Sequence, residues 1–234
     1  MQQSAARLTG GCSSSVVSSE GLLLTNHHCV ISCAENLSSA DHDYVKDGFL
    51  AADRTREQKC PGQQAEILTA ITDVTPRVKA AIGTSGGEAL TRARDAAMAA
   101  IEAEHCTDQT HRCQVLTLYG GGQYKLYIYR KYSDVRLVIA PEYQSAQFGG
   151  DPDNFNFPRF GLDAAFMRLY ENGAPVATPT HLKWVGRAPK PGEVVFAVGN
   201  PGTTQRLFTI SQLKLQRDLV LPTTLTLIPS FAGD

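Results

Sequence analysis

The sequence predicts a mainly β protein with helical insertions, and three observations lead to this prediction. Short runs that alternate in polarity or are apolar throughout recur along the 234 residues, as they do in strands. Turn signals rich in Gly and Ser separate several of these runs. One stretch near residues 75–105 instead repeats Ala, Met and Ile at helical spacing. We therefore expect a β-barrel that is interrupted by helices.

The first two predicted strands form a hairpin. Residues 14–18 and 22–25 are β-prone runs on either side of a Ser-Glu-Gly turn signal at 19–21. The second strand leads directly into the letters Asn-His-His-Cys at 26–29. The hairpin is thus expected to present a histidine pair at its end.

The middle of the chain combines further strands with the helical insertion. Helices are predicted at 75–82 and 88–104, and their connector at 83–87 reads Gly-Thr-Ser-Gly-Gly. These letters superficially match the box around a protease nucleophile, but glycine between two helices indicates a flexible connection, so Ser85 is assigned no catalytic role. Strands are predicted at 65–74, 112–119, 123–132 and 134–140, and another follows Asp163 up to residue 170. Towards the C-terminus, three more strands are predicted at 182–185, 193–199 and 206–212, and 213–221 is expected to leave the barrel.

Two sequence blocks resemble those of a known enzyme family. The first is Gly10-Gly11-Cys12 followed by Asn-His-His-Cys at 26–29, and the second is Phe-Gly-Gly-Asp-Pro-Asp-Asn-Phe-Asn-Phe-Pro-Arg at 148–159. In this order they resemble the bacterial dipeptidyl-peptidase 7 and dipeptidyl-peptidase 11 family of serine exopeptidases. The resemblance implies a trypsin-like double β-barrel capped by an inserted helical domain. It runs over nearly the whole chain, which would be only the first part of a family member: residues 1–185 would form the first barrel with the insertion, and 186–234 the start of the second barrel and the exit toward the cap.

The resemblance also implies a catalytic pair. In the chymotrypsin clan the histidine directly before the cysteine is the general base, which makes His28 the candidate and His27 a packing neighbour. A catalytic imidazole needs a carboxylate on its other nitrogen, and Asp163 matches the position at the mouth of an apolar strand. Asp151 and Asp153 are rivals, but they lie in a proline-interrupted loop where side-chain oxygens commonly satisfy turn amides.

The nucleophile is missing from the sequence. The chain order of the clan, His before Asp before Ser, requires a serine after Asp163. Ser211 and Ser230 are the serines that follow it, and neither has the glycine-rich elbow that builds an oxyanion hole. We therefore expect a fragment of a serine dipeptidyl peptidase that is inactive alone. The alternatives are a fragment of a trypsin-like serine endopeptidase and, if the gene ends here, a non-catalytic remnant.

Substrate recognition is expected from the second block. The α-ammonium group of a peptide needs oxygen acceptors near an aromatic wall. Family members use an asparagine and a following tryptophan of this block, and the matching residues here are Asn154 and Phe155. Phenylalanine lacks the indole donor, so amine recognition is expected to differ. Spacing alone favours a turn-capping Asn154 and a core Phe155, and it is the resemblance that favours the binding role.

The composition agrees with a soluble globular enzyme. Hydrophobic residues make up 42% and charged ones 19% of the chain, which indicates a packed core. The formal net charge of −1 gives no electrostatic basis for binding nucleic acid or an anionic membrane. No run approaches the roughly 18 apolar residues of a spanning helix, and no cofactor is expected. The resemblance implies peptides with a free N-terminus as partners and a homodimer for the full-length parent.

The six cysteines indicate an oxidising compartment. The first residues lack the apolar stretch of a signal peptide, but family members carry one, so the resemblance implies a periplasmic or secreted protein whose true N-terminus lies upstream. Many pairings of six cysteines exist. The precedent of the clan suggests the pair Cys12–Cys29. Local spacing, shared with similar family members, suggests Cys106–Cys113. Elimination then leaves Cys33–Cys60.

A zinc site is the competing interpretation of His27, His28, Cys29 and Cys33, which are zinc-type ligands within seven positions. Adjacent side chains on an extended segment point to alternating sides of it. These ligands therefore cannot converge on one ion, and no metal is expected.

Overall fold

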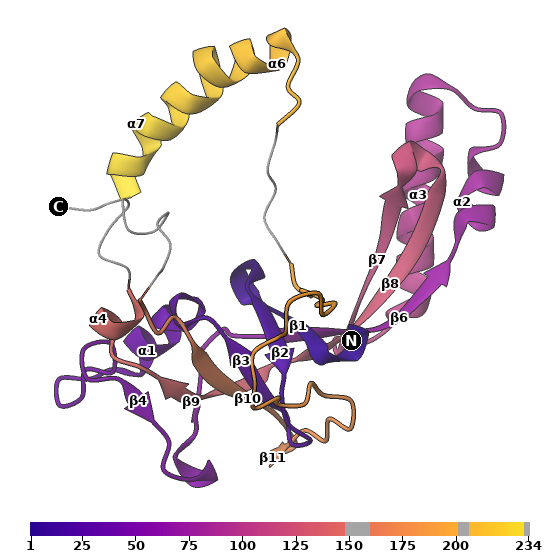
Figure 1. Cartoon of the computed structure of the whole chain (residues 1–234). Helices are drawn as coiled ribbons and strands as arrows, with labels where there is room; N and C mark the ends of the chain where they lie inside the picture. The colour runs from indigo at the N-terminus through magenta and orange to yellow at the C-terminus, as the bar shows by residue number, and fades with distance from the viewer. Residues whose placement is uncertain (148–159, 201–205, 232–234) are drawn as a thin grey trace. The chain divides into compact units, whose positions relative to one another are not determined.

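The computed structural model describes residues 1–147, 160–200 and 206–231, the last four by their backbone alone. The chain divides into two compact units, Met1–Asn200 and Pro201–Asp234 (Figure 1). The first unit carries the sheet and the candidate site, and the second is helical.

The first unit is built on an antiparallel sheet of 11 strands. The strands are β1 (Ala5–Leu8), β2 (Ser13–Val16), β3 (Leu22–Thr25), β4 (Phe49–Leu50), β5 (Gln58–Lys59), β6 (Ala65–Asp73), β7 (His111–Leu118), β8 (Gln123–Tyr132), β9 (Asp134–Ala140), β10 (Ala165–Glu171) and β11 (Ala174–Pro175). The main path runs in the order β4-β9-β10-β3-β2-β1-β6-β8-β7, with β11 paired to β10 and β5 to β9. Among the strands that the structure describes, this path is open, since β4 and β7 at its ends do not pair with each other.

The helices that the structure describes in the first unit are short except for one. They are the α-helices α1 (Ile31–Leu37), α2 (Thr75–Ile82), α3 (Gly87–His105) and α4 (Tyr143–Ala146), and the 3₁₀ turns η1 (Gln2–Ser4), η2 (Thr9–Gly11), η3 (His27–Cys29), η4 (Arg54–Arg56) and η5 (Tyr119–Gly121). The α2 and α3 helices coincide with the predicted insertion, and Ser85 lies in their connector, as expected. The molecule is therefore a mixed α/β structure with a large antiparallel sheet.

The β2–β3 hairpin forms where the sequence predicts it, and its turn requires glycine. Gly21 has φ +70°, and a Cβ atom there would lie 3.0 Å from the carbonyl oxygen of Leu169. The backbone N–H of Leu169 also donates to the Gly21 carbonyl at 3.0 Å. The turn thus packs directly on β10, where a side chain would clash.

The main hydrophobic core lies against the central strands. Side chains alternate between buried and half-buried along β3, as the two-residue period of a strand requires. The core includes several side chains with no exposed surface: Val16, Leu23, Val135, Leu137, Met167 and Leu169. Each such aliphatic side chain stabilises the fold by about 1.5–3 kcal/mol relative to an exposed one. This burial holds β3 and β10 in one register.

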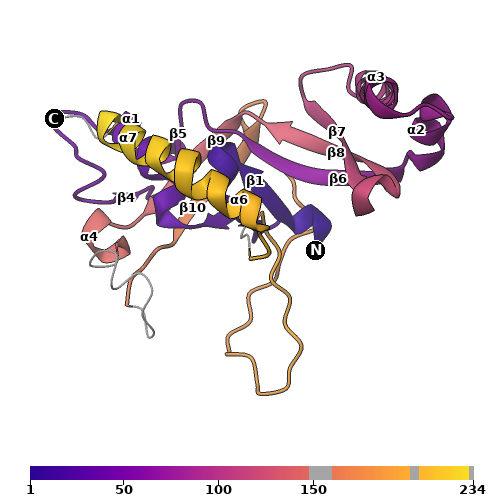
Figure 2. The same ribbon diagram turned by 90° about the horizontal axis from the view of Figure 1, so that it is seen from above.

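The insertion has a hydrophobic core of its own. Figure 2 shows α2 and α3 beside β6, β8 and β7, on the side of the sheet away from β4 and β9. Their shared apolar side chains are Val74, Val78, Ile101, Val115, Tyr124 and Leu126. The Glu102 carboxylate in α3 also accepts a hydrogen bond from the backbone N–H of Val115 in β7, at 2.6 Å. The helices are thereby fastened to the strands independently of the main core.

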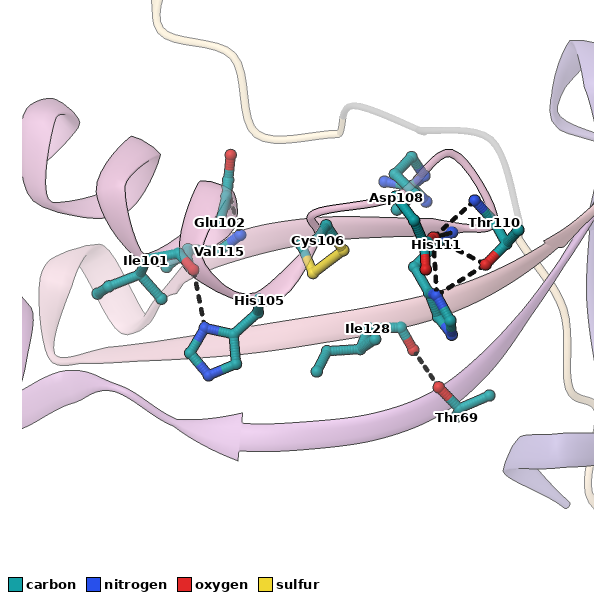
Figure 3. Close-up of a disulfide and its surroundings, with 12 residues drawn as sticks. Thr69, Ile101, Glu102, His105, Cys106, Asp108, Thr110, His111, Val115 and Ile128 are labelled. Atoms are coloured by element: carbon teal, nitrogen blue, oxygen red, sulfur yellow. Dashed lines mark hydrogen bonds and ion pairs between the residues drawn. A yellow bond between two sulfur atoms is a disulfide. The ribbon is translucent and has the colours of Figure 1, made fainter.

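A disulfide closes the loop between α3 and β7 (Figure 3). Cys106, directly after α3, is bonded to Cys113 in β7, with their Cα atoms 5.8 Å apart. Between them the Asp108 carboxylate accepts hydrogen bonds from the Thr110 hydroxyl and from the backbone N–H of Thr110, at 2.7 and 2.8 Å. These bonds and the nearby His111 ring lower the pKa of Asp108 to about 2. An ionised Asp108 therefore caps the turn at neutral pH.

The prediction of three strands towards the C-terminus is wrong. Residues 182–185 and 193–199 are irregular, and 206–212 leads into the helix α6 (Ile210–Leu215). The helix begins with a capping box, in which the Thr209 hydroxyl accepts from the backbone N–H of Gln212 and the Gln212 side chain accepts from that of Thr209. The two irregular segments have strand-like apolar side chains, but Trp184 and Phe196 are 66% and 71% exposed. A strand forms only when a neighbour pairs with its backbone, and no described strand does so here.

The helices that the structure describes in the second unit follow one another without a break. They are α6, the π-helical turn η6 (Gln216–Val220) and α7 (Leu221–Phe231). The wider π turn lies just before Pro222, which has no backbone N–H and clashes with the carbonyl four residues earlier in a regular α-helix. Within the described residues, no helix is both long and apolar enough to span a membrane.

A buried ion pair joins the segment between η4 and β5 to β10. The Glu57 carboxylate accepts from Nε of Arg168 at 2.9 Å and from the hydroxyl of Tyr170 at 2.9 Å, and the side chains of Glu57 and Arg168 are only 3% and 12% exposed. Burial and the neighbouring Glu57 raise the pKa of Tyr170, so its hydroxyl stays a donor. Arg168 also donates to the Glu20 carbonyl at 2.9 Å, which ties the β2–β3 turn to β10.

We expect Arg168→Leu to lower the free energy of unfolding by roughly 3–5 kcal/mol, because it leaves the Glu57 charge buried without its partner. Urea unfolding followed by circular dichroism measures this loss. Arg92→Leu is the matched control, since Arg92 pairs with Glu88 on the exposed face of α3, with the two side chains 76% and 91% exposed, and such a pair contributes little. Equal, small effects of the two substitutions would contradict the importance of the buried pair.

Candidate active site

His28 and Asp163 meet because two distant strands are neighbours in the sheet. The antiparallel register of β3 and β10 pairs Thr25 with Ala165 and Leu23 with Met167. Chain segments that leave one antiparallel strand lie beside those that enter the other. The residues just after Thr25 therefore lie next to those just before Ala165. Asp163 reaches the end of β3 in this way.

Asp163 makes two hydrogen bonds to His28. The ring Nδ1 of His28 lies 2.8 Å from Oδ2 of Asp163, and the backbone N–H of His28 donates to Oδ1 at 3.0 Å. An ionised carboxylate only accepts, so the neutral imidazole carries its proton on Nδ1 and leaves Nε2 as an acceptor. The His28 side chain is 62% exposed and that of Asp163 is 19% exposed. The free ring nitrogen is thus accessible, while the carboxylate is shielded.

The surroundings of Asp163 favour its ionised form. Burial acts to raise the pKa of Asp163, but the backbone N–H of His28, the His28 ring and the Asn26 amide together hold that pKa below its usual range. The carboxylate is therefore negatively charged at neutral pH and can stabilise an imidazolium ring.

Asn26 is a third participant that the sequence did not single out. Its side-chain amide donates to Oδ2 of Asp163 at 3.0 Å and lies 3.2 Å from the backbone carbonyl oxygen of the same residue. In the sequence, Asn26 stood out only as the first letter of the Asn-His-His-Cys block. Since side-chain amides at such places commonly cap turns, its contact with Asp163 could not be read from the local sequence.

The two adjacent histidines differ in their surroundings. His27 is 2% exposed, and its ring centroid lies 6.4 Å from that of Tyr143. His28 stands out toward solvent. The 3₁₀ turn η3 separates the two rings in this way, and His27 occupies the packing position expected for it.

The six cysteines form the three pairs that were expected. Cys29, directly after His28, is bonded to Cys12, with their Cα atoms 6.1 Å apart. In the described part of the chain, Cys12, His28 and Cys29 bring ligand-type atoms within 4.8 Å of one another. Zinc binds cysteine as thiolate, and these two sulfurs are bonded to each other instead. The donor set therefore does not fit a metal.

Several predicted site residues fall outside this geometry. Asn154, Phe155, Asp151 and Asp153 lie outside the described residues. Ser211 lies in α6, within the second unit. Among the residues that the structure describes, no serine forms a hydrogen bond with His28, and the side-chain hydrogen bond of His28 is the one to Asp163.

Comparison with known proteins identifies similar chains. Residues 1–232 match the family model described as Peptidase S46. The chain is 35% identical to the Asp/Glu-specific dipeptidyl-peptidase of Porphyromonas endodontalis, covering 87% of this chain and 31% of that protein. It is 32% identical to the dipeptidyl-peptidase 7 of the same organism, covering 86% of this chain and 26% of that protein.

The structural comparison gives the same picture. A crystal structure of Porphyromonas endodontalis DPP11 in complex with substrate matches with a TM-score of 0.69 and 30% sequence identity, over 81% of this chain and 30% of that one. A second structure of this protein, in complex with the dipeptide Arg-Glu, matches with a TM-score of 0.68. The chain thus spans between 26% and 31% of the length of these relatives.

We expect Asp163→Asn to destabilise the fold in a pH-dependent way. The pKa of Asp163 is lower in the folded chain than its ordinary value, so ionised Asp163 stabilises the fold above the unfolded pKa of about 3.9, and this contribution is lost as the pH falls through the folded pKa. The difference in unfolding free energy between wild type and Asp163→Asn should therefore shrink between about pH 5 and pH 2. Urea titrations across this range measure it, with the exposed Asp41→Asn as the control. A difference that does not vary with pH would contradict the expected ionisation.

Proposed function

The chain belongs to the peptidase S46 family, and we propose that it supplies the general base and the orienting carboxylate of a serine dipeptidyl peptidase. The observation that carries this proposal is the 2.8 Å contact between Nδ1 of His28 and Oδ2 of Asp163. Together with the exposed ring of His28, it is the arrangement that a serine-activating imidazole needs.

The proposed reaction uses the two ring nitrogens for different tasks. Nε2 of His28 takes the proton of a serine hydroxyl as that oxygen attacks the peptide carbonyl, and later gives the proton to the leaving amine. Asp163 holds the Nδ1–H and stabilises the imidazolium that forms meanwhile. The serine and its oxyanion hole come from a segment outside this chain. A base and its carboxylate alone cannot carry out acyl transfer.

The proposed substrates are peptides with a free N-terminus, from which a dipeptide is released. This follows the names of the relatives, which include a dipeptidyl-peptidase 7 and an Asp/Glu-specific dipeptidyl-peptidase. Asn154 is proposed to accept a hydrogen bond from the substrate ammonium group, beside the aromatic wall of Phe155. Recognition of that group would stop the peptide two residues from the cleaved bond.

The wider architecture is proposed from the same family. Residues 1–185 would form the first barrel of a trypsin-like double β-barrel, with the insertion of α2 and α3, and 186–234 the start of the second barrel and the exit toward a helical cap. The exposed apolar side chains at 182–198, such as Trp184 and Phe196, are the kind that pairing with further strands would bury. The three disulfides support a periplasmic or secreted location, and the full-length protein is proposed to be a homodimer.

In a full-length protein that contains this segment, we expect His28→Ala to lower kcat by about 10⁴-fold or more with little change in KM, because triad members act as a unit. Asp163→Asn should cause a similarly large loss, since it removes the acceptor for the Nδ1 proton. Steady-state kinetics with a chromogenic dipeptide substrate measure both effects.

Two controls accompany this experiment. Asp151→Asn should have a small effect, and a larger loss there than at Asp163 would show that the carboxylate is misassigned. The isolated 234-residue chain should release no dipeptide; steady release that a serine-directed phosphonate abolishes would reveal a nucleophile within it.

We expect Asn154→Ala in the full-length protein to lower kcat/KM for dipeptide release, because binding of the remote ammonium group contributes to transition-state stabilisation. Reaction with a small serine-directed inhibitor should be nearly unchanged. The informative comparison uses two substrates that differ only in a free or acetylated N-terminus. Equal cleavage of both would exclude the exopeptidase proposal and favour a trypsin-like endopeptidase.

A further inference from the structure

We propose that Asn26 is a positioning residue for the His28–Asp163 pair: its amide fixes the carboxylate of Asp163, and through it the orientation and tautomer of the His28 ring. This inference rests on the proposed function, in which that pair is the catalytic base and its partner. Asn26 itself contacts neither the free nitrogen of His28 nor a reacting atom.

The first argument is the hydrogen bond that Asn26 does not make. Asn26 occupies the N-cap position of η3, yet its side chain makes no capping hydrogen bond. An asparagine at this position ordinarily accepts from a backbone N–H of the first turn. Here the N–H of His28 donates to Oδ1 of Asp163 instead, at 3.0 Å. Asp163, in the segment just before β10, therefore takes over the capping role, which frees the Asn26 side chain to act as a donor.

The second argument is where the freed amide points. Asn26 Nδ2 lies 3.0 Å from Oδ2 of Asp163 and 3.2 Å from the backbone oxygen of Asp163. Because its two acceptors belong to the side chain and the main chain of one residue, the amide restrains rotation of the Asp163 side chain. A side chain that merely filled space at this exposed position would have no such pair of contacts.

The third argument is how the acceptor sites of the carboxylate are shared. Oδ1 accepts the His28 N–H, and Oδ2 accepts both the Asn26 amide and the Nδ1–H of the His28 ring. An oxygen that accepts two donors directs them along different lone pairs. When the Asn26 amide occupies one lone pair of Oδ2, the other lone pair is the one that faces Nδ1 of His28. The amide also contributes to the lowered pKa of Asp163, which keeps that acceptor ionised.

The test measures the tautomer of His28 in the 234-residue chain itself, so it needs no nucleophile. Correlations between the carbon-bound ring protons and the ring nitrogens in ¹⁵N-labelled protein distinguish a protonated from a free nitrogen for each of the six histidines. A His28→Gln variant assigns the His28 signals. The measurement is made in wild type, Asn26→Ala and Asn36→Ala, at a pH where the ring is neutral.

We expect the Nδ1-protonated form to predominate in wild type and its ratio to the Nε2-protonated form to fall about fivefold in Asn26→Ala, the effect of one ordinary hydrogen bond. Asn36→Ala is the matched control, because the Asn36 amide donates to the Ser32 carbonyl in α1, at 2.7 Å. It should leave the His28 ratio unchanged. The other five histidines should keep their wild-type signals in both variants.

Different failures have different meanings. If wild-type His28 does not carry its proton on Nδ1, the proposed function fails. If it does and Asn26→Ala leaves the ratio unchanged, the function stands and the role of Asn26 is overturned. Should Asn26→Ala not fold, Asn26→Leu has a similar size, removes the N–H donors without adding a charge, and should lower the ratio to a similar extent; an unchanged ratio there would also overturn the inference.

Discussion

The pairing of β3 with β10 is the constraint on which the candidate site depends. His28 and Asp163 lie 135 positions apart in the chain and meet because Thr25 pairs with Ala165. The register is strict because the side-chain period of a strand is two residues, so a slip by one would expose Leu23, Met167 and Leu169. Apolar burial inside the sheet therefore sets the geometry of a polar pair at the ends of these two strands.

Covalent and ionic contacts restrain the chain at both ends of β3. At one end the Cys12–Cys29 disulfide joins the residue after His28 to the residue before β2. At the other end Arg168 of β10 donates to the Glu20 carbonyl in the β2–β3 turn while its charge is balanced by buried Glu57. The turn itself can lie this close to β10 because Gly21 has no side chain. The exposed His28 ring thus projects from a backbone that a disulfide and hydrogen bonds restrain on both sides.

The helical insertion is stabilised by contacts of its own. It has its own core around Leu126 and Ile101, its own disulfide at Cys106 and the Glu102 carboxylate on the β7 backbone. Its stability is therefore provided locally, and β6 and β8 link it to the sheet. This separation agrees with an insertion that leaves the register of β3 and β10 unaffected.

The sequence by itself determined the elements whose signals are local. The bounds of β3, β8, β9 and α2 agree with the predicted ranges, because alternation, helical spacing and proline near a helix start act over a few residues. The predictions at 182–185 and 193–199 failed for the converse reason: an apolar run becomes a strand only when another segment pairs with it. His28 could be proposed from its motif, whereas only the tertiary structure placed Asp163 against it. The contribution of Asn26 was decided entirely there, because the acceptor of its amide lies 137 residues away along the chain and a hydrogen bond depends on distance in space.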